Sequence, residues 1–459
     1  MWMDSAARGP VMDIDHGVAD LRDFRVKKGK FAWARMRIKC GHPIIYEYLF
    51  KQRDLMSVPN LNSRRVLLSA LLWCACQFAA AQSPAPAPVA FAPLEPTLTA
   101  ALVQYKLPAL AAAVVQDGRI IAAGAVGTRK VGSGIAVTVN DRFHIGSDTK
   151  AFTATLAGIL VDRGAMAWTT TLGEAFPELS PKMDPDFRRI TISQLLSHTS
   201  GIPADNAEFL ELLAKSMFEE GNLDDLRYWT LQQWMSKPLP GQPGQQGQRF
   251  AYSNLGYTIA GAMIERVARK SWEELINEWI FDPMELKSAG LGSQATLGRV
   301  DAALGHVLVG EDIAKPFMAG PGDDNPQLIA PAGGANMSVL DFARWAGWNA
   351  GEGKRGPALL KPETLKLLHA PVIDMPHVQN PVPGTPTDGK YGLGWVTAKM
   401  DWAPQPLVFH GGSNQKNLAH IWLSPEKDFA IVVVTNIASK GANDALFAVA
   451  EKLYRQFAP

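Results

Sequence analysis

The chain has 459 residues, of which 47% are apolar, 19% charged and 9% aromatic. This composition can form a large buried core and excludes a wholly disordered protein. The balance of 45 basic and 44 acidic residues, a net charge of +1, argues against general affinity for nucleic acid or anionic membranes. Three cysteines are too few for a disulfide scaffold or a four-cysteine zinc site.

The N-terminal region differs in composition from the rest of the chain. Arg64 and Arg65 precede an uncharged apolar run over 66–73, which is followed by three alanines at 79–81 and a Pro/Ala tract. A basic segment, a short apolar segment and small residues before the cleavage point are typical of a secretory signal peptide. We therefore predict a signal peptide over 56–81 and a Pro/Ala-rich linker over 82–93. The alternative, a membrane anchor, needs about 20 apolar residues, so we expect no stable membrane span after signal cleavage.

This interpretation has consequences for localisation and charge. Residues 1–55 are interpreted as a non-native or disordered upstream extension, with translation starting near Met56, because signal peptides begin at the amino terminus. Export by the Sec or twin-arginine route would place the protein in the periplasm or outside the cell. All three cysteines lie before residue 80, and residues 1–81 carry 13 Lys and Arg against 7 Asp and Glu. The mature chain is therefore expected to be acidic and free of cysteine.

The predicted elements place strands at both ends of the mature chain and helices between them. In chain order they are a hairpin over 110–126 with its turn at Asp117-Gly118, helices over 149–162 and 255–268, strands over 407–410, 418–423 and 429–435, and a helix over 442–457. This order predicts one α+β domain over 94–459. Its antiparallel sheet would be formed by both chain ends and flanked by helices, with a mostly helical lobe inserted between them.

Three long segments contain no regular pattern. They are rich in Gly, Pro or polar residues and cover 238–247, 314–327 and 370–390. Loops of this length in a compact domain are often functional lids, and flexible insertions are the alternative.

Ser147-Asp148-Thr149-Lys150 is an S-x-x-K sequence that opens a predicted amphipathic helix. Residues i and i+3 share a helix face, so the amine of Lys150 can reach the hydroxyl of Ser147. A desolvated lysine can lose its proton near neutral pH and activate a serine nucleophile. Serines 413 and 424 also begin S-x-x-K sequences, but they lie in turns or at strand ends. The alternative for Ser147 is a helix N-cap.

Two further elements strengthen the catalytic interpretation of Ser147. Tyr252-Ser253-Asn254 is the only Y-x-N sequence and precedes a predicted helix. A phenol can relay protons and a carboxamide can bind a substrate amide or ester, although a tyrosine alone is more often a core residue. His410-Gly411-Gly412-Ser413 follows a predicted strand. Its glycines allow close approach of a substrate, and the Ser413 amide could donate to an oxyanion, whereas a solvated strand-end histidine is the alternative for His410.

Together these motifs resemble the serine β-lactamase-related hydrolases. This group includes class C β-lactamases, D-alanyl-D-alanine carboxypeptidases, D-aminopeptidases and family VIII carboxylesterases. The resemblance extends over about 94–453 and includes the segments 195–201, 332–334 and 391–395. It implies a β-lactamase/penicillin-binding-protein-like fold, with Ser147 as nucleophile, Lys150 as base and Tyr252 as proton relay. Asn254 and the 410–413 segment would contact substrate, the Ser147 and Ser413 amides would form the oxyanion hole, and His198 and Gly201 would be structural.

The chain departs from this family's K-T-G element, where it has His410-Gly411-Gly412. Because a neutral imidazole replaces a permanent cation, carboxylate substrates are disfavoured and small neutral esters or amides are favoured. The alternatives are a β-lactamase, a D-alanyl-D-alanine carboxypeptidase or a D-aminopeptidase, and a non-enzymatic penicillin-recognising sensor. No metal or other cofactor is implied, and no pattern specifies an oligomeric state.

Overall fold

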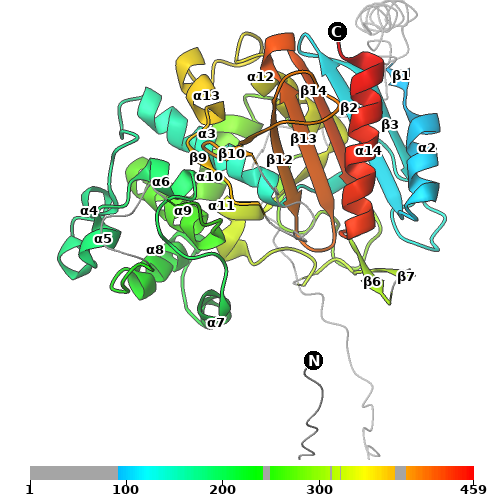
Figure 1. Ribbon diagram of the computed structural model, residues 1–459. Helices are drawn as coiled ribbons and strands as arrows, with labels where there is room; N and C mark the ends of the chain where they lie inside the picture. Colours follow the sequence, from blue (N-terminus) through cyan, green and yellow to red (C-terminus); the bar gives the residue numbers. More distant parts are fainter. Residues whose placement is uncertain (1–90, 241–248, 311–312, 321, 378–388) are drawn as a thin grey trace, which may run out of the picture. The chain divides into compact units, whose positions relative to one another are not determined.

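The computed structural model describes residues 91–459 apart from 241–248, 311–312, 321 and 378–388. A nine-stranded sheet is the frame of this region (Figure 1). Its strands, in spatial order, are β1 (Ala92–Pro93), β3 (Arg119–Gly127), β2 (Ala109–Gln116), β14 (Phe429–Thr435), β13 (Leu418–Ser424), β12 (Leu407–Ser413), β11 (Val396–Ala398), β10 (Lys390–Tyr391) and β9 (Ile373–Asp374). All neighbours pair antiparallel except β1 and β3.

The N-terminal hairpin joins the C-terminal strands through the pairing of β2 with β14, which sets Leu110 opposite Thr435. Asp117 and Gly118 connect β2 to β3 with φ angles of +51° and +70°. Two left-handed residues are what a type I′ hairpin turn requires, so the predicted turn is present where the Asp-Gly pair stands. The prediction of an α+β fold with a sheet built from both chain ends is confirmed.

Helices cover both faces of the sheet (Figure 1). Strand β2 shows how its residues are divided between them: Leu110, Ala112 and Val114 belong to the apolar cluster with α2 (Glu95–Gln104) and α14 (Lys440–Phe457). The alternate residues of β2 belong to the cluster on the other face, with α12 (Val339–Ala350) and α3 (Thr149–Asp162). Because successive strand residues point to opposite faces, a strand buried on both sides becomes continuously apolar.

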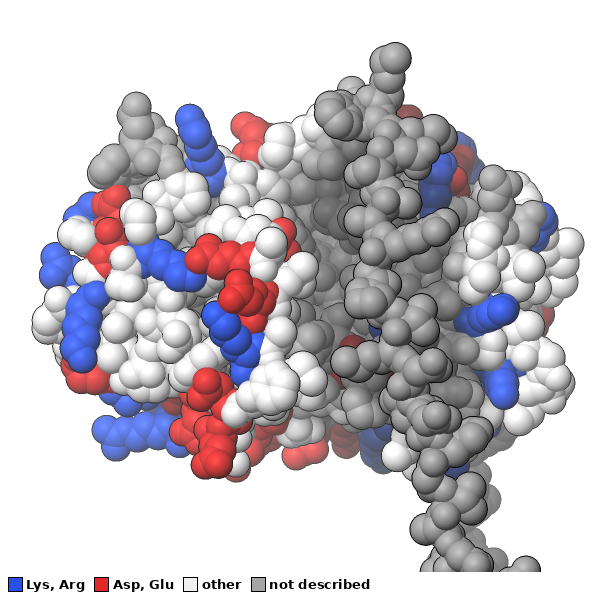
Figure 2. Space-filling model, turned by 90° about the horizontal axis from the view of Figure 1, so that it is seen from below, with Lys and Arg blue, Asp and Glu red and all other residues white. Residues whose placement is uncertain are grey.

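The helical lobe, residues 171–281, stands beside the sheet (Figure 1). Its helices are α4 (Leu172–Ala175), α5 (Pro185–Arg188), α6 (Ile192–Leu196), α7 (Ala207–Ser216), α8 (Leu223–Trp234), α9 (Asn254–Ala268) and α10 (Trp272–Ile276). Two smaller sheets, β4-β8-β5 and β6-β7, and two more helices complete the fold: β4 (Arg142–His144), β8 (Ala335–Ser338), β5 (Gly290–Leu291), β6 (His306–Val309), β7 (Ile313–Pro316), α11 (Ala330–Gly333) and α13 (Pro362–His369). On the face in Figure 2, acidic and basic side chains are interspersed over the described surface.

Several predicted boundaries were wrong. The segment 314–327 was expected to be irregular but begins with the last three residues of β7, and 370–390 contains β9. Both strands are short and partly exposed, so they carry no apolar pattern. The strand expected over 407–410 continues to Ser413, because Gly411 and Gly412 pair with β13. The linker predicted to end at residue 93 already contributes β1 to the sheet.

The predicted upstream extension (1–55), the signal peptide (56–81) and residues 82–90 of the linker lie outside the described residues. Most of the predicted loop over 238–247 and part of 370–390 also lie outside them. Among the helices that the structure describes, none is long and apolar enough to cross a membrane.

A buried ion pair ties the helical lobe together. The fully buried guanidinium of Arg227 on α8 donates to Glu265 at 2.7 Å and to Glu273 at 2.6 Å. Removing it in Arg227→Ala leaves the 6%-exposed Glu265 carboxylate without its cation, so we expect a loss of about 3–5 kcal/mol in the free energy of unfolding. Denaturant titration measures this, with Arg266→Ala as control, since Arg266 pairs with Glu178 at the surface and should cost about 1 kcal/mol or less. Equal losses in the two variants would contradict the prediction.

Candidate active site

Ser147 lies in a tight turn between a strand and a buried helix. The 3₁₀ turn η1 (Gly146–Asp148) follows β4 and leads directly into α3. The Gly146 amide donates to Nδ1 of His144 at 3.0 Å, so the other ring nitrogen of His144 donates to Asp324 at 2.5 Å. Ser147 is partly exposed while both of its neighbours are buried. The turn thus presents one hydroxyl at the surface of a rigid, buried segment.

Lys150 is fully buried one helical turn after Ser147. Its Nζ atom is 3.1 Å from Oγ of Ser147, 2.7 Å from Oδ1 of Asn254 and 2.8 Å from the carbonyl oxygen of Ala332 on α11. Burial lowers the pKa of Lys150 to about 7, although the charge of Asp205 and then that of Asp148 oppose the shift. The amine is therefore poised to exchange a proton near neutral pH.

Tyr252 and Asn254 reach Ser147 and Lys150 from the start of α9. Ser253 between them caps this helix by accepting from the Gly256 amide. The Tyr252 side chain hydrogen-bonds with Ser147, and its ring lies 4.7 Å from Nζ of Lys150. Burial raises the pKa of the Tyr252 phenol above its usual value, so it is protonated at neutral pH. The fold thus places the Y-x-N sequence beside the S-x-x-K sequence.

His198, two residues after the end of α6, packs against the segment that carries Tyr252 and Ser253. The residue has a left-handed backbone with φ +59°, and its Nδ1 accepts from the Ser253 amide at 3.1 Å. Its ring centroid is 4.3 Å from that of Tyr252. His198 therefore contacts both the backbone and the ring of the Y-x-N segment.

Strand β12 packs directly against the turn that carries Ser147. A Cβ atom added to Gly412 would lie 1.9 Å from the carbonyl oxygen of Ile145 and 2.7 Å from the Ser147 amide nitrogen. One added to Gly146 would lie 2.2 Å from the Ser413 amide nitrogen. Only glycines permit this approach. The backbone around Ser147 and the backbone around Ser413 are therefore in close contact, and the role of their amides in an oxyanion hole stays a prediction.

The imidazole of His410 is fully buried rather than solvated at a strand end. It contacts the Tyr391 hydroxyl at 3.0 Å through Nε2 and the Gly411 carbonyl oxygen at 2.9 Å through Nδ1. Burial, and then the charge of Lys150, lower the pKa of His410 to about 3, so the ring is neutral at pH 7. The sequence suggested that this ring contacts substrate directly, but the ring has no solvent-accessible surface in the structure.

Two acidic residues belong to the site although the sequence did not single them out. Asp148 is buried, with neither carboxylate oxygen hydrogen-bonded in the described structure, and lies 3.7 Å from Nδ1 of His410. Burial raises its pKa well above the usual range and favours the uncharged acid. Asp205, in contrast, is exposed, and it accepts from the backbone and side-chain amides of Asn254 at 3.1 and 2.6 Å.

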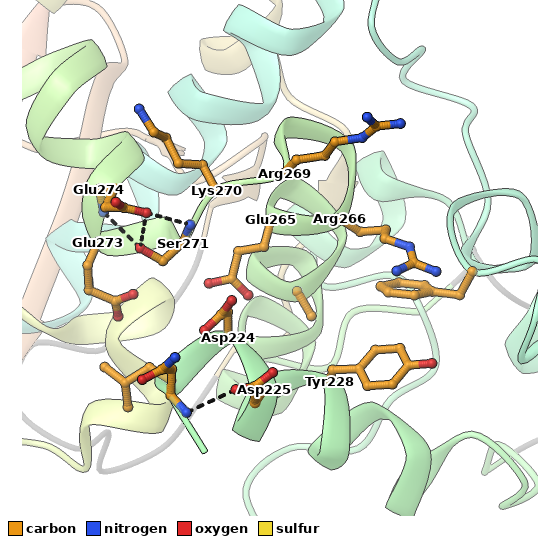
Figure 3. A pocket seen from close by; sticks show the side chains of 14 residues that line it. Asp224, Asp225, Tyr228, Glu265, Arg266, Arg269, Lys270, Ser271, Glu273 and Glu274 are labelled. Carbon is orange, nitrogen blue, oxygen red and sulfur yellow. Dashed lines mark hydrogen bonds between the residues drawn. The ribbon is translucent and has the colours of Figure 1, made fainter.

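A cavity of about 950 Å³ lies elsewhere, between α8, α9 and α10 of the helical lobe (Figure 3). No candidate site residue lines it. Two of its acidic side chains bind residues at helix starts, Glu274 with Ser271 and Asp225 with Asn222, as the dashed lines show. Glu265 is held by Arg227. This groove is therefore separate from the candidate active site. The described residues also contain no group of three His, Cys, Asp or Glu arranged to hold a metal.

Comparisons with known proteins identify one family over most of the chain. The family model described as Beta-lactamase matches residues 94–454. Penicillin-binding protein 4 of Amycolatopsis lactamdurans is 27% identical over 340 residues, covering 72% of this chain and 82% of that protein. Protein flp of Staphylococcus aureus strain MW2 is 24% identical over 73% of this chain, but the match spans only 60% of its own length.

Solved structures show the same fold. The octameric penicillin-binding protein homologue from Pyrococcus abyssi superimposes with a TM-score of 0.61 and 25% identity, over 78% of this chain and 76% of that one. SurE superimposes with a TM-score of 0.60 and 21% identity, over 79% and 74% of the two chains. With the family match extending over most of its length, this chain belongs to the beta-lactamase family, whose members are in general serine hydrolases.

Proposed function

We propose that this protein is an exported serine hydrolase that cleaves small esters or amides through an acyl-enzyme on Ser147. The observation that carries the proposal is the set of contacts around Nζ of Lys150. Two of its three partners, Oδ1 of Asn254 and the Ala332 carbonyl oxygen, can only accept hydrogen bonds. A neutral amine gives its two N–H groups to them, so that its lone pair is left for the Ser147 hydroxyl.

Acylation follows from this geometry. Neutral Lys150 takes the hydroxyl proton as Oγ of Ser147 attacks the substrate carbonyl carbon. Negative charge moves to the carbonyl oxygen, where the Ser147 and Ser413 amides would donate to it. The proton then passes from Lys150, through the Tyr252 hydroxyl beside Ser147, to the departing alcohol or amine as its bond to the carbonyl carbon breaks.

Deacylation can use the same groups in reverse. Water enters in place of the leaving group and loses a proton to the Tyr252–Lys150 pair as its oxygen attacks the ester carbonyl. The bond to Oγ of Ser147 then breaks, and Ser147 recovers its proton. This cycle returns every group to its starting state and needs no co-reactant besides water.

The substrate preference rests on the absence of an accessible cation at position 410. A buried, neutral His410 offers no charge to a substrate carboxylate. Neutral esters and amides lose nothing by this replacement, whereas substrates that carry a carboxylate lose an attractive partner.

A β-lactam-directed or D-peptide-directed activity is the second candidate, because one similar protein is named a penicillin-binding protein and another a homologue of one. A chromogenic cephalosporin tests the β-lactam arm. We expect slow turnover or none, since His410 lacks the charge that attracts the β-lactam carboxylate. Efficient cephalosporin hydrolysis would overturn our inference from His410, and a stable adduct on Ser147 without turnover would favour a penicillin-recognising sensor.

Ser147→Ala should lower hydrolysis of p-nitrophenyl butyrate by roughly 10³-fold or more, because no other group can form the acyl-enzyme. Release of p-nitrophenol measures the rate, and mass spectrometry of the wild-type protein should find the acyl group on Ser147. Ser424→Ala is the matched control, since Ser424 begins another S-x-x-K sequence but lies on β13, away from the site. Unchanged turnover in Ser147→Ala would refute the assignment.

The pH dependence should follow Lys150. Because burial lowers its pKa to about 7 and only the unprotonated amine accepts the serine proton, kcat/KM should fall about tenfold per pH unit below that value. His410 titrates near pH 3 and should add no limb between pH 4 and 9. Lys150→Arg, which stays protonated, should lose roughly 10²- to 10⁴-fold at every pH. A flat profile between pH 5 and 8 in the wild-type enzyme would exclude Lys150 as the base.

A further inference from the structure

Asp205 differs from the other charged or titratable residues of the candidate site because its side chain is exposed. It is also in direct contact with Asn254. Lys150 is fully buried, His410 is buried and neutral, and burial favours the uncharged form of Asp148. The Asp205 carboxylate, in contrast, is solvent-exposed. An incoming substrate that contacts Asn254 therefore meets an exposed carboxylate beside it.

The Asp205 carboxylate is fixed in direction by Asn254. Its Oδ1 accepts from the Asn254 backbone amide at 3.1 Å and its Oδ2 from the Asn254 side-chain amide at 2.6 Å. Asn254 is itself oriented by Lys150, whose Nζ is 2.7 Å from its Oδ1. A chain of contacts thus runs from Asp205 through Asn254 to the base of the reaction, and the charge of Asp205 reaches far enough to raise the pKa of Lys150.

This carboxylate still has binding capacity. An ionised carboxylate offers about four acceptor positions, and the two contacts with Asn254 use only two of them. No ion pair joins Asp205 to a Lys, Arg or His side chain within the part of the chain that the structure describes. The Asp205 carboxylate is exposed and held in one orientation, and no cationic side chain of the described residues pairs with it. It is therefore suited to bind a cationic group of a bound molecule.

We propose that Asp205 is a specificity-determining residue that binds the ammonium group of the substrate. The preferred substrates are then esters or amides with a free primary amine near the scissile bond, such as aminoacyl esters, aminoacyl amides or peptides with a free amino terminus. This inference rests on the proposed function, since it assumes that Ser147 is acylated by a substrate lying against Asn254.

The test compares two esters that differ only in the ammonium group: alanine benzyl ester, in both enantiomers, and benzyl propionate. Benzyl alcohol release gives kcat/KM for each substrate. A charge-assisted contact should favour the amine ester by roughly 10- to 100-fold in the wild-type enzyme. N-acetylalanine benzyl ester, which keeps the added bulk but not the charge, should lose this advantage.

Asp205→Asn should lower the amine-to-propionate ratio by at least about tenfold. Because any change in Asn254 or Lys150 affects both esters, it cancels in the ratio. Asp224→Asn is the matched control: it removes one negative charge from the same helical lobe, at the groove of Figure 3, and should leave the ratio at the wild-type value.

The outcomes separate the two proposals. Ser147-dependent hydrolysis of benzyl propionate, with no preference for the amine ester or with an unchanged ratio in Asp205→Asn, would overturn the role of Asp205 and leave the proposed function standing. Equal loss of the ratio in Asp224→Asn would reduce the effect to general charge attraction and would also overturn it. Absence of Ser147-dependent hydrolysis of all of these esters would overturn both.

Discussion

The site depends on the burial of one lysine. An amine taken out of water is stable in its charged form only if every N–H finds an acceptor, and its neutral form becomes accessible when desolvation is only partly compensated. Lys150 has three oxygen partners. Burial lowers its pKa to about 7, and nearby acidic charges limit the shift. The turn that carries Ser147, α9 and α11 each supply one of those three oxygens.

The three partners come from segments far apart in the chain, and the fold brings them together by close packing. Helix α9 passes α11 so tightly that a Cβ on Gly261 would lie 2.6 Å from Pro331, beside the carbonyl of Ala332. On the other side of the turn, Gly412 lets β12 touch the backbone of Ile145 and Ser147. Such contacts leave no room for adjustment, because protein interiors are packed as densely as organic crystals. The hydroxyl of Ser147 is thereby held at a fixed place relative to the amine of Lys150.

Local patterns were sufficient to predict the elements that carry the motifs. The hairpin turn at Asp117-Gly118, helix α3 and most of α9 follow from turn chemistry and apolar periodicity, and each lies within a residue or so of its predicted bounds. The acids of the site could not be found in this way. Asp148 resembles a solvated residue at a helix start until tertiary packing buries it, and Asp205 is 49 residues from the amide it binds. The Ala332 carbonyl is a backbone atom, which no side-chain pattern can mark.

The replacement at position 410 and the pKa of Lys150 are physically linked. The ring of His410 and the amine of Lys150 are both fully buried, and the charge of Lys150 already lowers the pKa of His410. A permanent cation at position 410 would repel the protonated Lys150 in return and would depress its pKa further. A neutral imidazole removes this repulsion, so the charge of Asp205 opposes the effect of burial on the Lys150 pKa without a neighbouring cation working against it. If Lys150 is the base and Asp205 the substrate-binding acid, as proposed, the same residue that gives up attraction for a substrate carboxylate also avoids a further fall in the pKa of the base.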